Sequence, residues 1–481
     1  MSTFDEASTH NPLSNRAVHI LGSITAIAWI IQTIASYWLA PAGLAYGGVV
    51  SGQQLYADMT GIEAIDWLAK SRYWLPLFFL PLVVSSICTM ALLFQIMRRP
   101  PSQSTVRAVF SWTFVFGVIC LPAIPVLAQD FWLSAAWGKM IATGLNPYHQ
   151  DIPHDIAARW YADLNPTRMT YGPLWAIISG LVMTVSNHPW VVFSLFKAVI
   201  AGSWAGALII VRKMTESLPF RDQCTAIAIV GWMPLVLYFS VSEGHNDIVM
   251  AVFALFAFYI RNPIALAASV CIKYVSGPLG LIFLLAREPF NARLLIGYLF
   301  SSLLVIACFV LFYRGIEFFD AARAMTWEFL TPSSAVAIAG RPAQWAATAV
   351  FPIIAIYQGV KWVKERKEPR RRVFALALLS AGMFAILPHV WPWYLVLLLV
   401  FAAVAPSAPL SRWLTGLALG APFAVAMAAR GWSFDSVMHI PDTALYLFAL
   451  TWLAFTGWIM TSHYNAPRYT ISPEAPPSIQ S

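Results

Sequence analysis

The sequence predicts an all-α, polytopic membrane protein, and two observations indicate this class. Of the 481 residues, 59% are apolar and only 11% are charged, whereas soluble globular proteins carry roughly 25% charged residues. The apolar residues are also gathered into long runs, and a run of about 20 residues is what a membrane-spanning helix requires. This composition excludes a soluble enzyme, a disordered chain and a disulfide-stapled scaffold.

The apolar runs predict about 13–14 transmembrane helices that span or half-span the bilayer. The runs lie near residues 18–39, 73–97, 107–128, 189–212, 223–241, 245–260, 263–287, 292–313, 342–363, 372–388, 392–405, 411–429 and 443–462. In the run 263–287, Lys273 and Ser276-Gly277-Pro278 interrupt the pattern, so we expect two short helices that meet at a break. The stretch 173–187 is too short to span comfortably and is expected in the outer interface.

The basic residues predict the orientation of these helices. They cluster in the loops Arg98 to Arg107, Arg212 to Arg221 and Arg287 to Arg293, and seven of them lie within 361–372. By the positive-inside rule these loops are cytoplasmic, which leaves the segments 40–72, 129–188, 314–341 and 430–442 on the outer face. The net charge of +8 is therefore assigned to membrane topology and not to a nucleic-acid partner.

The outer loop 129–188 contains the first candidate catalytic residue. Asp130 follows directly after an apolar run, and Asp130, Ser134 and Trp137 would share one face of a helix by their i, i+4, i+7 spacing. A carboxylate beside an aromatic wall could remove the proton of a sugar hydroxyl. The alternative is that Asp130 only caps the following helix, since Asp is a favoured N-cap residue.

A second acid lies in the stretch Gly244-His245-Asn246-Asp247, which opens a predicted helix on the outer side. Asp247 or His245 could orient Asp130 or bind a sugar hydroxyl. Two neighbouring carboxylates would also raise the pKa of one of them, which helps a base to work near neutral pH. Here too the alternative is a helix-capping segment.

Lys197 and Lys273 are the two basic residues that fall inside predicted helices. A buried ammonium group is costly, so each is a functional candidate that could stabilise the charge of a leaving phosphate. The alternative is that the lysine stems extend to the outer interface. Lys273→Met is expected to leave folding unharmed or to improve it, since the substitution removes a buried charge.

Other chemistries find little support. The five cysteines all lie in apolar runs, which indicates neither a disulfide framework nor a metal knuckle. Six histidines fall on outer segments without a recognised metal-binding spacing, so no cofactor is expected, with a divalent metal as the alternative. No nucleotide-sugar, Walker or Gly-rich phosphate motif is present, and no inner loop is long enough for a cytosolic catalytic domain.

Five ordered stretches carry a family resemblance. The first runs from Asp130 to Tyr148 and includes Trp137-Gly138 and Gly144-Leu145-Asn146-Pro147. The others are Tyr171-Gly172-Pro173-Leu174-Trp175, Glu243 to Asp247, Lys273-Tyr274, and Pro388-His389-Val390-Trp391-Pro392-Trp393-Tyr394. This set resembles the GT-C superfamily of integral-membrane glycosyltransferases. It is most similar to glycosyltransferase family 87 and the related mannosyltransferases that use polyprenyl-phosphate sugars.

The resemblance implies an inverting enzyme that moves a sugar, with mannose the commonest in the family, from a polyprenyl-phosphate donor to a lipid-linked or periplasmic glycan acceptor. The implied base is Asp130, with Asp247 as the second acid. Substrate binding would fall to Lys273, Lys197, His245, Asn146, Tyr148, Tyr171, Trp137, His389 and Trp393. The aromatic residues near Trp393 could equally be interface anchors.

The resemblance also implies a domain organisation. A two-helix addition would occupy 1–106, the GT-C-like core 107–405, a helical hairpin 406–464 and a disordered tail 465–481. The enzyme would lie in the plasma membrane (the bacterial inner membrane) with its active site on the outer face. A transporter or lipid flippase, or an O-antigen ligase or polymerase, is the alternative, since those are also multi-pass proteins with outer loops or broken helices.

Overall fold

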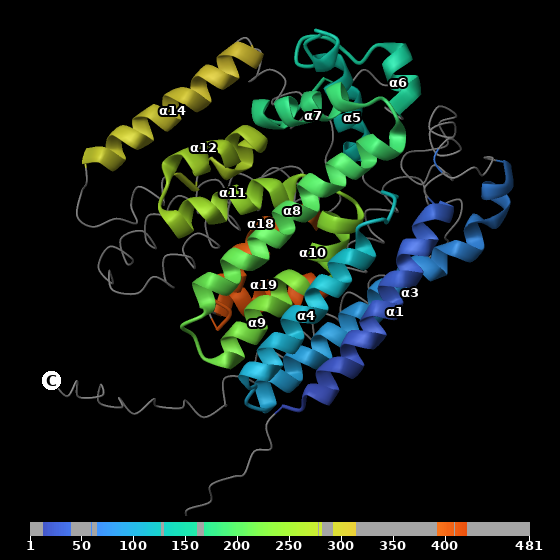
Figure 1. Cartoon of the computed structure of the whole chain (residues 1–481), viewed down its shortest axis with the longest axis vertical. Coiled ribbons are helices and arrows are strands. Elements are labelled where there is room, and N and C mark those ends of the chain that lie inside the picture. The colour runs from blue at the N-terminus through green and yellow to red at the C-terminus, as the bar shows by residue number, and fades with distance from the viewer. Residues whose placement is uncertain are drawn as a thin grey trace, which may run out of the picture.

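The computed structural model describes residues 13–39, 59, 65–126, 129–160, 168–277, 279–280, 292–313, 392–407 and 409–420. Throughout these ranges every regular element is a helix (Figure 1), which confirms the predicted all-α class. The apolar runs 342–363, 372–388 and 443–462, the basic segment 361–372 and the candidate His389 lie outside the described residues.

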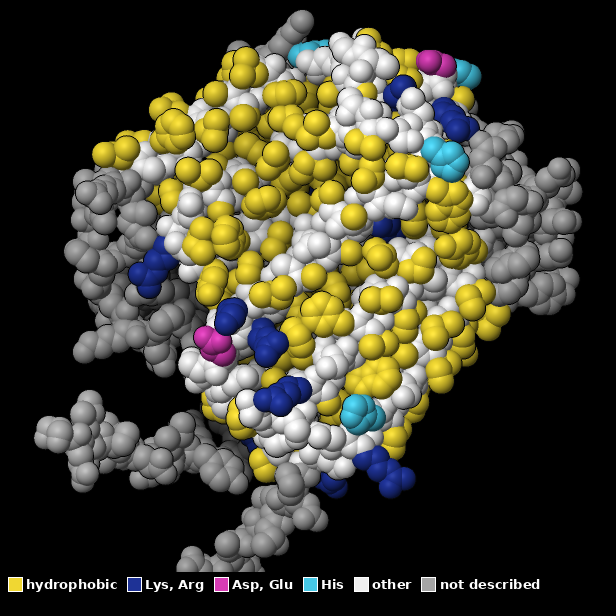
Figure 2. All heavy atoms as spheres, in the orientation of Figure 1, with side chains coloured by type: hydrophobic (Ala, Val, Ile, Leu, Met, Phe, Trp, Pro, Cys, Tyr) yellow, Lys and Arg dark blue, Asp and Glu magenta, His cyan; other side chains and the backbone are white. Residues whose placement is uncertain are grey.

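Five helical segments are long and apolar enough to cross a membrane. They are Asn15–Tyr37, Leu77–Arg98, Gln103–Cys120, Pro189–Thr215 and Phe220–Ser242. Figure 2 shows a broad apolar surface on the face in view, with Lys and Arg side chains gathered mainly at its lower end. The chain is therefore a multi-pass membrane protein by the length and composition of its helices.

The N-terminal helices α1 (Asn15–Leu39), α3 (Ile65–Arg98) and α4 (Gln103–Cys120) pack side by side in Figure 1. The N-terminus of α4 is fixed by Ser102, whose hydroxyl accepts a hydrogen bond from the Thr105 amide at 3.3 Å. The helix ends at Cys120, earlier than the predicted 107–128. Pro122 and Pro125 explain the difference, because each removes an amide that a helix would use.

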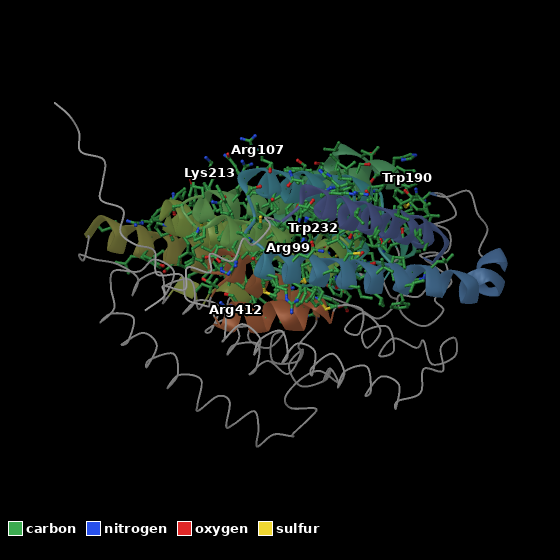
Figure 3. The ribbon with its side chains drawn as sticks, turned by 90° about the horizontal axis from the view of Figure 1, so that it is seen from below. Arg99, Arg107, Trp190, Lys213, Trp232 and Arg412 are labelled. Atoms are coloured by element: carbon green, nitrogen blue, oxygen red, sulfur yellow. The ribbon has the colours of Figure 1, made fainter. Side chains whose placement is uncertain are left out.

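Helices α8 (Pro189–Thr215) and α9 (Phe220–Gly231) form the centre of the bundle with α4. Figure 3 labels Trp190 and Lys213 near the two ends of α8, with Trp232 between them in the view. Trp232 is fully buried and donates its indole N–H to the Val109 carbonyl at 3.0 Å. Pro234 divides the predicted 223–241 helix into α9, α10 (Pro234–Val236) and the π-helix η2 (Leu237–Ser242).

After η2 the chain forms a short hairpin of α11 (Asp247–Ile260) and α12 (Pro263–Ile272). Arg261 makes the turn in the left-handed region at φ 57°. With 14 and 10 residues, the two helices reach only about 21 Å and 15 Å, too short to cross a bilayer. The chain therefore returns to the level of Asp247 when it reaches Lys273.

The predicted break in the run 263–287 is confirmed. Helix α12 ends at Ile272, Lys273 is extended at φ −151° and ψ 117°, and a 3-10 turn, η3 (Tyr274–Ser276), follows. The break thus begins at Lys273 itself. Lys273 has left the helical path, so its side chain is free to turn toward the start of α11.

The remaining elements surround this hairpin. Helices α5 (Gln129–Ala142), α6 (His154–Trp160) and α7 (Pro173–Val185) gather at the upper end of Figure 1. Helix α14 (Ala292–Tyr313) packs on α12. The 3-10 turn η4 (Pro392–Tyr394) leads into α18 (Leu395–Val404), and α19 (Pro409–Leu419) packs on α18.

Basic and acidic residues of interest lie at opposite ends of the helices. Helix α4 begins near Arg107 and ends shortly before Asp130, whereas the α9–η2 span begins near Arg221 and ends shortly before Asp247. Both acids therefore lie at the end of the bundle away from the basic loops. This polarity is what the orientation predicted from the sequence requires.

Candidate active site

Asp130 is the centre of a cluster built from three separate segments. It is the second residue of α5, so it lies in the first turn and not at the N-cap position. The Tyr171 hydroxyl donates a hydrogen bond to its carboxylate, and His245 Nδ1 lies 3.6 Å from Asp130 Oδ2. The Asp130 side chain keeps 33% of its exposure, whereas His245 keeps 2%. Asp130 is thus held by its neighbours yet accessible.

Asp247 and Lys273 form a buried salt bridge beside this cluster. Lys273 Nζ donates to both Asp247 oxygens, at 2.9 and 3.0 Å. The side chains of Lys273 and Asp247 are only 7% and 1% exposed. The same ammonium lies 4.7 Å from the Tyr394 ring centroid and 5.3 Å from that of Tyr171. These contacts hold the charge by a carboxylate and two aromatic faces.

A main-chain contact brings Tyr171 to the helix break. The Gly172 amide donates to the Ile272 carbonyl at 2.9 Å, which places Tyr171 directly beside Lys273. A Cβ at Gly172 would collide with the Cys271 carbonyl, so only glycine permits this approach. The segment before α7 and the end of α12 are therefore locked together at the cluster.

The other predicted residues of the outer loop support Tyr171. The Tyr148 hydroxyl donates to the Tyr171 carbonyl at 3.0 Å, and the Asn146 side chain accepts from the Tyr148 amide at 2.9 Å. Trp137 packs edge-on against Tyr171, with ring centroids 5.8 Å apart. The structure therefore places Trp137, Asn146 and Tyr148 behind the cluster, where they hold Tyr171.

The aromatic turn η4 covers the opposite side of the cluster. Trp393 stacks on the His245 ring at a centroid distance of 4.2 Å and an angle of 19°. Trp393 itself is 4% exposed. The ring face that Trp393 turns toward the cluster is covered by His245. Trp393 therefore orients the histidine.

The environment of Asp130 tunes its acidity. Burial raises the pKa of the Asp130 carboxyl above its ordinary value, while the Tyr171 hydrogen bond and the Lys273 charge act in the opposite direction. Burial and the Asp130 charge raise the pKa of Tyr171 well above its ordinary value, so Tyr171 remains a proton donor. A carboxylate with a raised pKa is better matched to general-base catalysis near neutral pH.

Lys197 is not brought to this cluster. It is 2% exposed on α8, and its Nζ donates to the carbonyls of Val241 and Ser242 at the end of η2, the first at 2.6 Å. These contacts satisfy main-chain carbonyls that the π-helix leaves unpaired. The structure thus gives Lys197 a different environment from that of Lys273.

Two residues near the cluster escaped the sequence reasoning. Glu243 is fully buried and accepts the Val126 amide with both carboxylate oxygens, at 3.2 and 3.1 Å. Asn246 is 4% exposed, and neither end of its amide has a hydrogen-bond partner in the described part of the chain. An unpaired buried amide costs free energy unless a ligand or water satisfies it. Both residues lie within the Glu243 to Asp247 stretch, and this position is the feature of the sequence that could have identified them.

The arrangement offers two carboxylates with different tasks. Asp247 is neutralised by Lys273, whereas Asp130, among the described residues, accepts a side-chain hydrogen bond from the Tyr171 hydroxyl and lies 3.6 Å from His245. Asp130 is consequently the carboxylate that can accept a proton from an incoming hydroxyl. No group of three or more His, Cys, Asp or Glu side chains that could hold a metal occurs among the described residues.

Comparison with known proteins agrees with the resemblance. Residues 18–309 match the family model described as "Alpha-(1->6)-mannopyranosyltransferase, N-terminal domain". The match begins within α1 and ends within α14, so it contains the loop of Asp130, the stretch from Glu243 to Asp247 and the break at Lys273. No curated protein and no solved structure matches the chain. The chain belongs to this family of mannosyltransferases, within the GT-C class of membrane glycosyltransferases.

Proposed function

We propose that the protein transfers a mannosyl group from a polyprenyl-phosphate donor to the 6-hydroxyl of a mannose in a lipid-linked or periplasmic glycan. The observation that carries this proposal is the Asp130 cluster. A partly exposed carboxylate with a raised pKa stands beside a fixed buried cation at the end of the bundle away from the basic loops. The linkage follows from the description of the matching family.

The proposed reaction is a single displacement. Asp130 accepts the proton of the acceptor 6-hydroxyl while the oxygen of that hydroxyl forms a bond to the anomeric carbon of the donor. The bond from that carbon to the phosphate oxygen breaks, and its electron pair leaves with the polyprenyl phosphate. Such a displacement inverts the anomeric centre, so an α-linked product requires a β-linked donor. The proton on Asp130 passes to solvent after the product leaves.

The proposed role of Lys273 is to stabilise the leaving phosphate. Its ammonium carries three donors, and within the described part of the chain the bonds to Asp247 Oδ1 and Oδ2 leave one for a phosphate oxygen. A cation fixed in advance stabilises developing charge without reorganisation at the moment of reaction. Asp247 is then the residue that holds the cation in place.

The unpaired amide of Asn246 supports a sugar site at the same place. Asn246 lies between His245, which faces Asp130, and Asp247, which holds Lys273. A sugar hydroxyl can satisfy both ends of such an amide. We therefore assign Asn246 and His245 to sugar hydroxyls of donor or acceptor.

Transfer by the purified protein tests the proposal. The protein in lipid nanodiscs receives radiolabelled β-mannosyl polyprenyl phosphate and an α-mannoside acceptor, and the product linkage is determined. An α-(1→6) product is expected, and none should form with an acceptor whose 6-hydroxyl is methylated. Movement of intact donor across the bilayer without transfer would indicate a flippase, and en bloc transfer of a preassembled glycan would indicate a ligase.

The outer location has its own test. Asp155 and Glu216 are exposed residues on α6 and just after α8. In a background without the native cysteines, a cysteine at 155 should react with an impermeant maleimide added to intact cells, and one at 216 only after lysis. Labelling of both from the same side would refute the orientation.

A further inference from the structure

A second buried charged cluster lies next to the candidate site and has no part in the proposed reaction. It consists of Lys197 on α8 and Glu243 at the end of η2, which are 2% and 0% exposed. The two charges interact electrostatically. Neither side chain contacts the Asp130 carboxylate in the described contacts, so both require a separate explanation.

The side chains of Lys197 and Glu243 both form hydrogen bonds with main-chain groups. Lys197 binds the carbonyls of Val241 and Ser242, where the π-helix ends. Glu243 binds the Val126 amide, which Pro122 and Pro125 keep out of any helix. Lys197 therefore fixes the η2 end to α8, and Glu243 fixes the segment 121–126 to that same end.

Both anchored segments lead directly to the site. Val126 precedes Asp130 by four residues, and Glu243 precedes His245 by two and Asp247 by four. Gly244, at φ 78°, lies against the Phe131 ring, which a Cβ there would strike. The two segments are consequently in contact at two places, Val126 with Glu243 and Phe131 with Gly244.

We infer that Lys197 and Glu243 are positioning residues that tether the segment before Asp130 to the segment before His245 and Asp247, and so set the separation of the catalytic groups. This inference rests on the proposed function. A displacement near 1 Å between a base and its substrate can cost on the order of 10²-fold in rate. The tether sets the 3.6 Å separation of Asp130 and His245, the distance most sensitive to its loss.

The test is a double-variant cycle of Lys197→Met, Glu243→Met and the combined variant, since Met keeps the length of each side chain but cannot replace its hydrogen bonds to the main chain. Each single variant leaves one buried charge without the opposite charge with which it interacts, so the Tm of that variant should fall. The combined variant removes both charges and should regain much of the lost Tm. Its kcat should nevertheless stay about 10²-fold below wild type with KM little changed, since the tether is still absent.

The chain supplies a matched control on the same helix. Lys213 and Glu216 form an exposed pair at 3.6 Å, with side chains 57% and 65% exposed. The variant Lys213→Met/Glu216→Met, with the same two substitutions, should keep the wild-type Tm and kcat, because exposed pairs contribute little. Glu243→Gln, which keeps an acceptor oxygen for the Val126 amide, should recover part of the kcat lost in Glu243→Met.

Two kinetic results would overturn the inference. Wild-type kcat in the combined variant, with Tm restored, would make the cluster purely structural. A raised KM with unchanged kcat would make Lys197 or Glu243 a substrate contact.

Hydrogen exchange of peptides covering 121–130 supplies a readout independent of transfer. Exchange there should be faster in the combined variant than in wild type or the surface control, and unchanged exchange would refute the tether. If the wild-type protein transfers no mannose, the proposed function fails, while hydrogen exchange still decides whether the tether exists.

Discussion

Two lysine–carboxylate groupings lie four residues apart along the Glu243 to Asp247 stretch, and they use the same charges in different ways. Lys273 binds Asp247 directly at 2.9 Å, and the pair stands beside a carboxylate that is 33% exposed. Lys197 and Glu243 are as deeply buried, but each binds the main chain. The first grouping presents a cation to the site, whereas the second joins backbone segments.

The difference teaches that burial of a charge does not by itself identify a catalytic group. Both lysines are nearly inaccessible, at 2% for Lys197 and 5% for Lys273. What separates them is the partner. A cation held by a carboxylate and two aromatic rings keeps a donor for a ligand, while one that binds the carbonyls of a helix end satisfies groups which would otherwise be unpaired.

The largest expected effect is at Asp130. Asp130→Asn keeps the size and much of the hydrogen bonding but cannot accept a proton, so the transfer rate should fall by about 10²–10⁴-fold. Tm and donor affinity should remain near wild type, because Asn has the size of Asp and its side-chain oxygen can still accept the hydrogen bond from Tyr171. Rate, Tm and donor binding are measured on one preparation. A stable, fully active variant would move the base to Asp247.

The second largest effect is expected for Lys273→Met, which tests how Lys273 differs from Lys197. The sequence alone led to the expectation that Lys273→Met is harmless to folding, but the salt bridge to Asp247 overturns it. Removal of one partner of a buried pair costs about 3–5 kcal/mol, and turnover should fall on the order of 10²-fold.

Lys273→Met/Asp247→Asn should recover stability without recovering turnover, as shown by thermal unfolding and transfer assays. If the double variant transfers at the wild-type rate, the Asp247–Lys273 pair has no part in catalysis.

The hydrogen bond from Tyr171 gives a smaller, pH-dependent effect. Burial raises the pKa of Asp130 and the Tyr171 hydroxyl lowers it, because the hydroxyl donates to the charged form. Tyr171→Phe removes this donor, so the pKa of Asp130 should rise further. The acidic limb of the kcat/KM profile, where activity is lost as the base becomes protonated, should then move to higher pH. An unchanged limb would mean that another group is the base.

The smallest expected effect concerns packing at Gly172. Gly172→Ala places a Cβ against the Cys271 carbonyl and should cost about 1–3 kcal/mol, as overpacking does. Gly202 on α8 is the matched control, since nothing lies within 4 Å of a Cβ there. Gly202→Ala should instead stabilise the helix by roughly 0.5–1 kcal/mol. Equal Tm values for both variants would show that the Tyr171 loop does not approach the helix break so closely.

The sequence by itself determined the class of the fold and most residues of the candidate site. Long apolar runs require helices in a bilayer, because unpaired main-chain groups are too costly there. Asp130, Asp247, His245, Lys273 and Tyr171 were identified from helix ends, an interrupted run and a family resemblance. Such signals are local, so they can be recognised without tertiary contacts. The predicted domain boundaries remain a prediction.

Only the tertiary structure decided which partner each charged group has. Lys197 and Lys273 have similar apolar neighbours in sequence, yet one meets the carbonyls of Val241 and Ser242 and the other meets Asp247. Glu243 belongs to the same stretch as Asp247, but its carboxylate binds the Val126 amide, 117 residues earlier in the chain. These pairings join segments that are distant in sequence. They depend on where Pro122, Pro125 and Pro234 interrupt helices and on how the resulting ends pack.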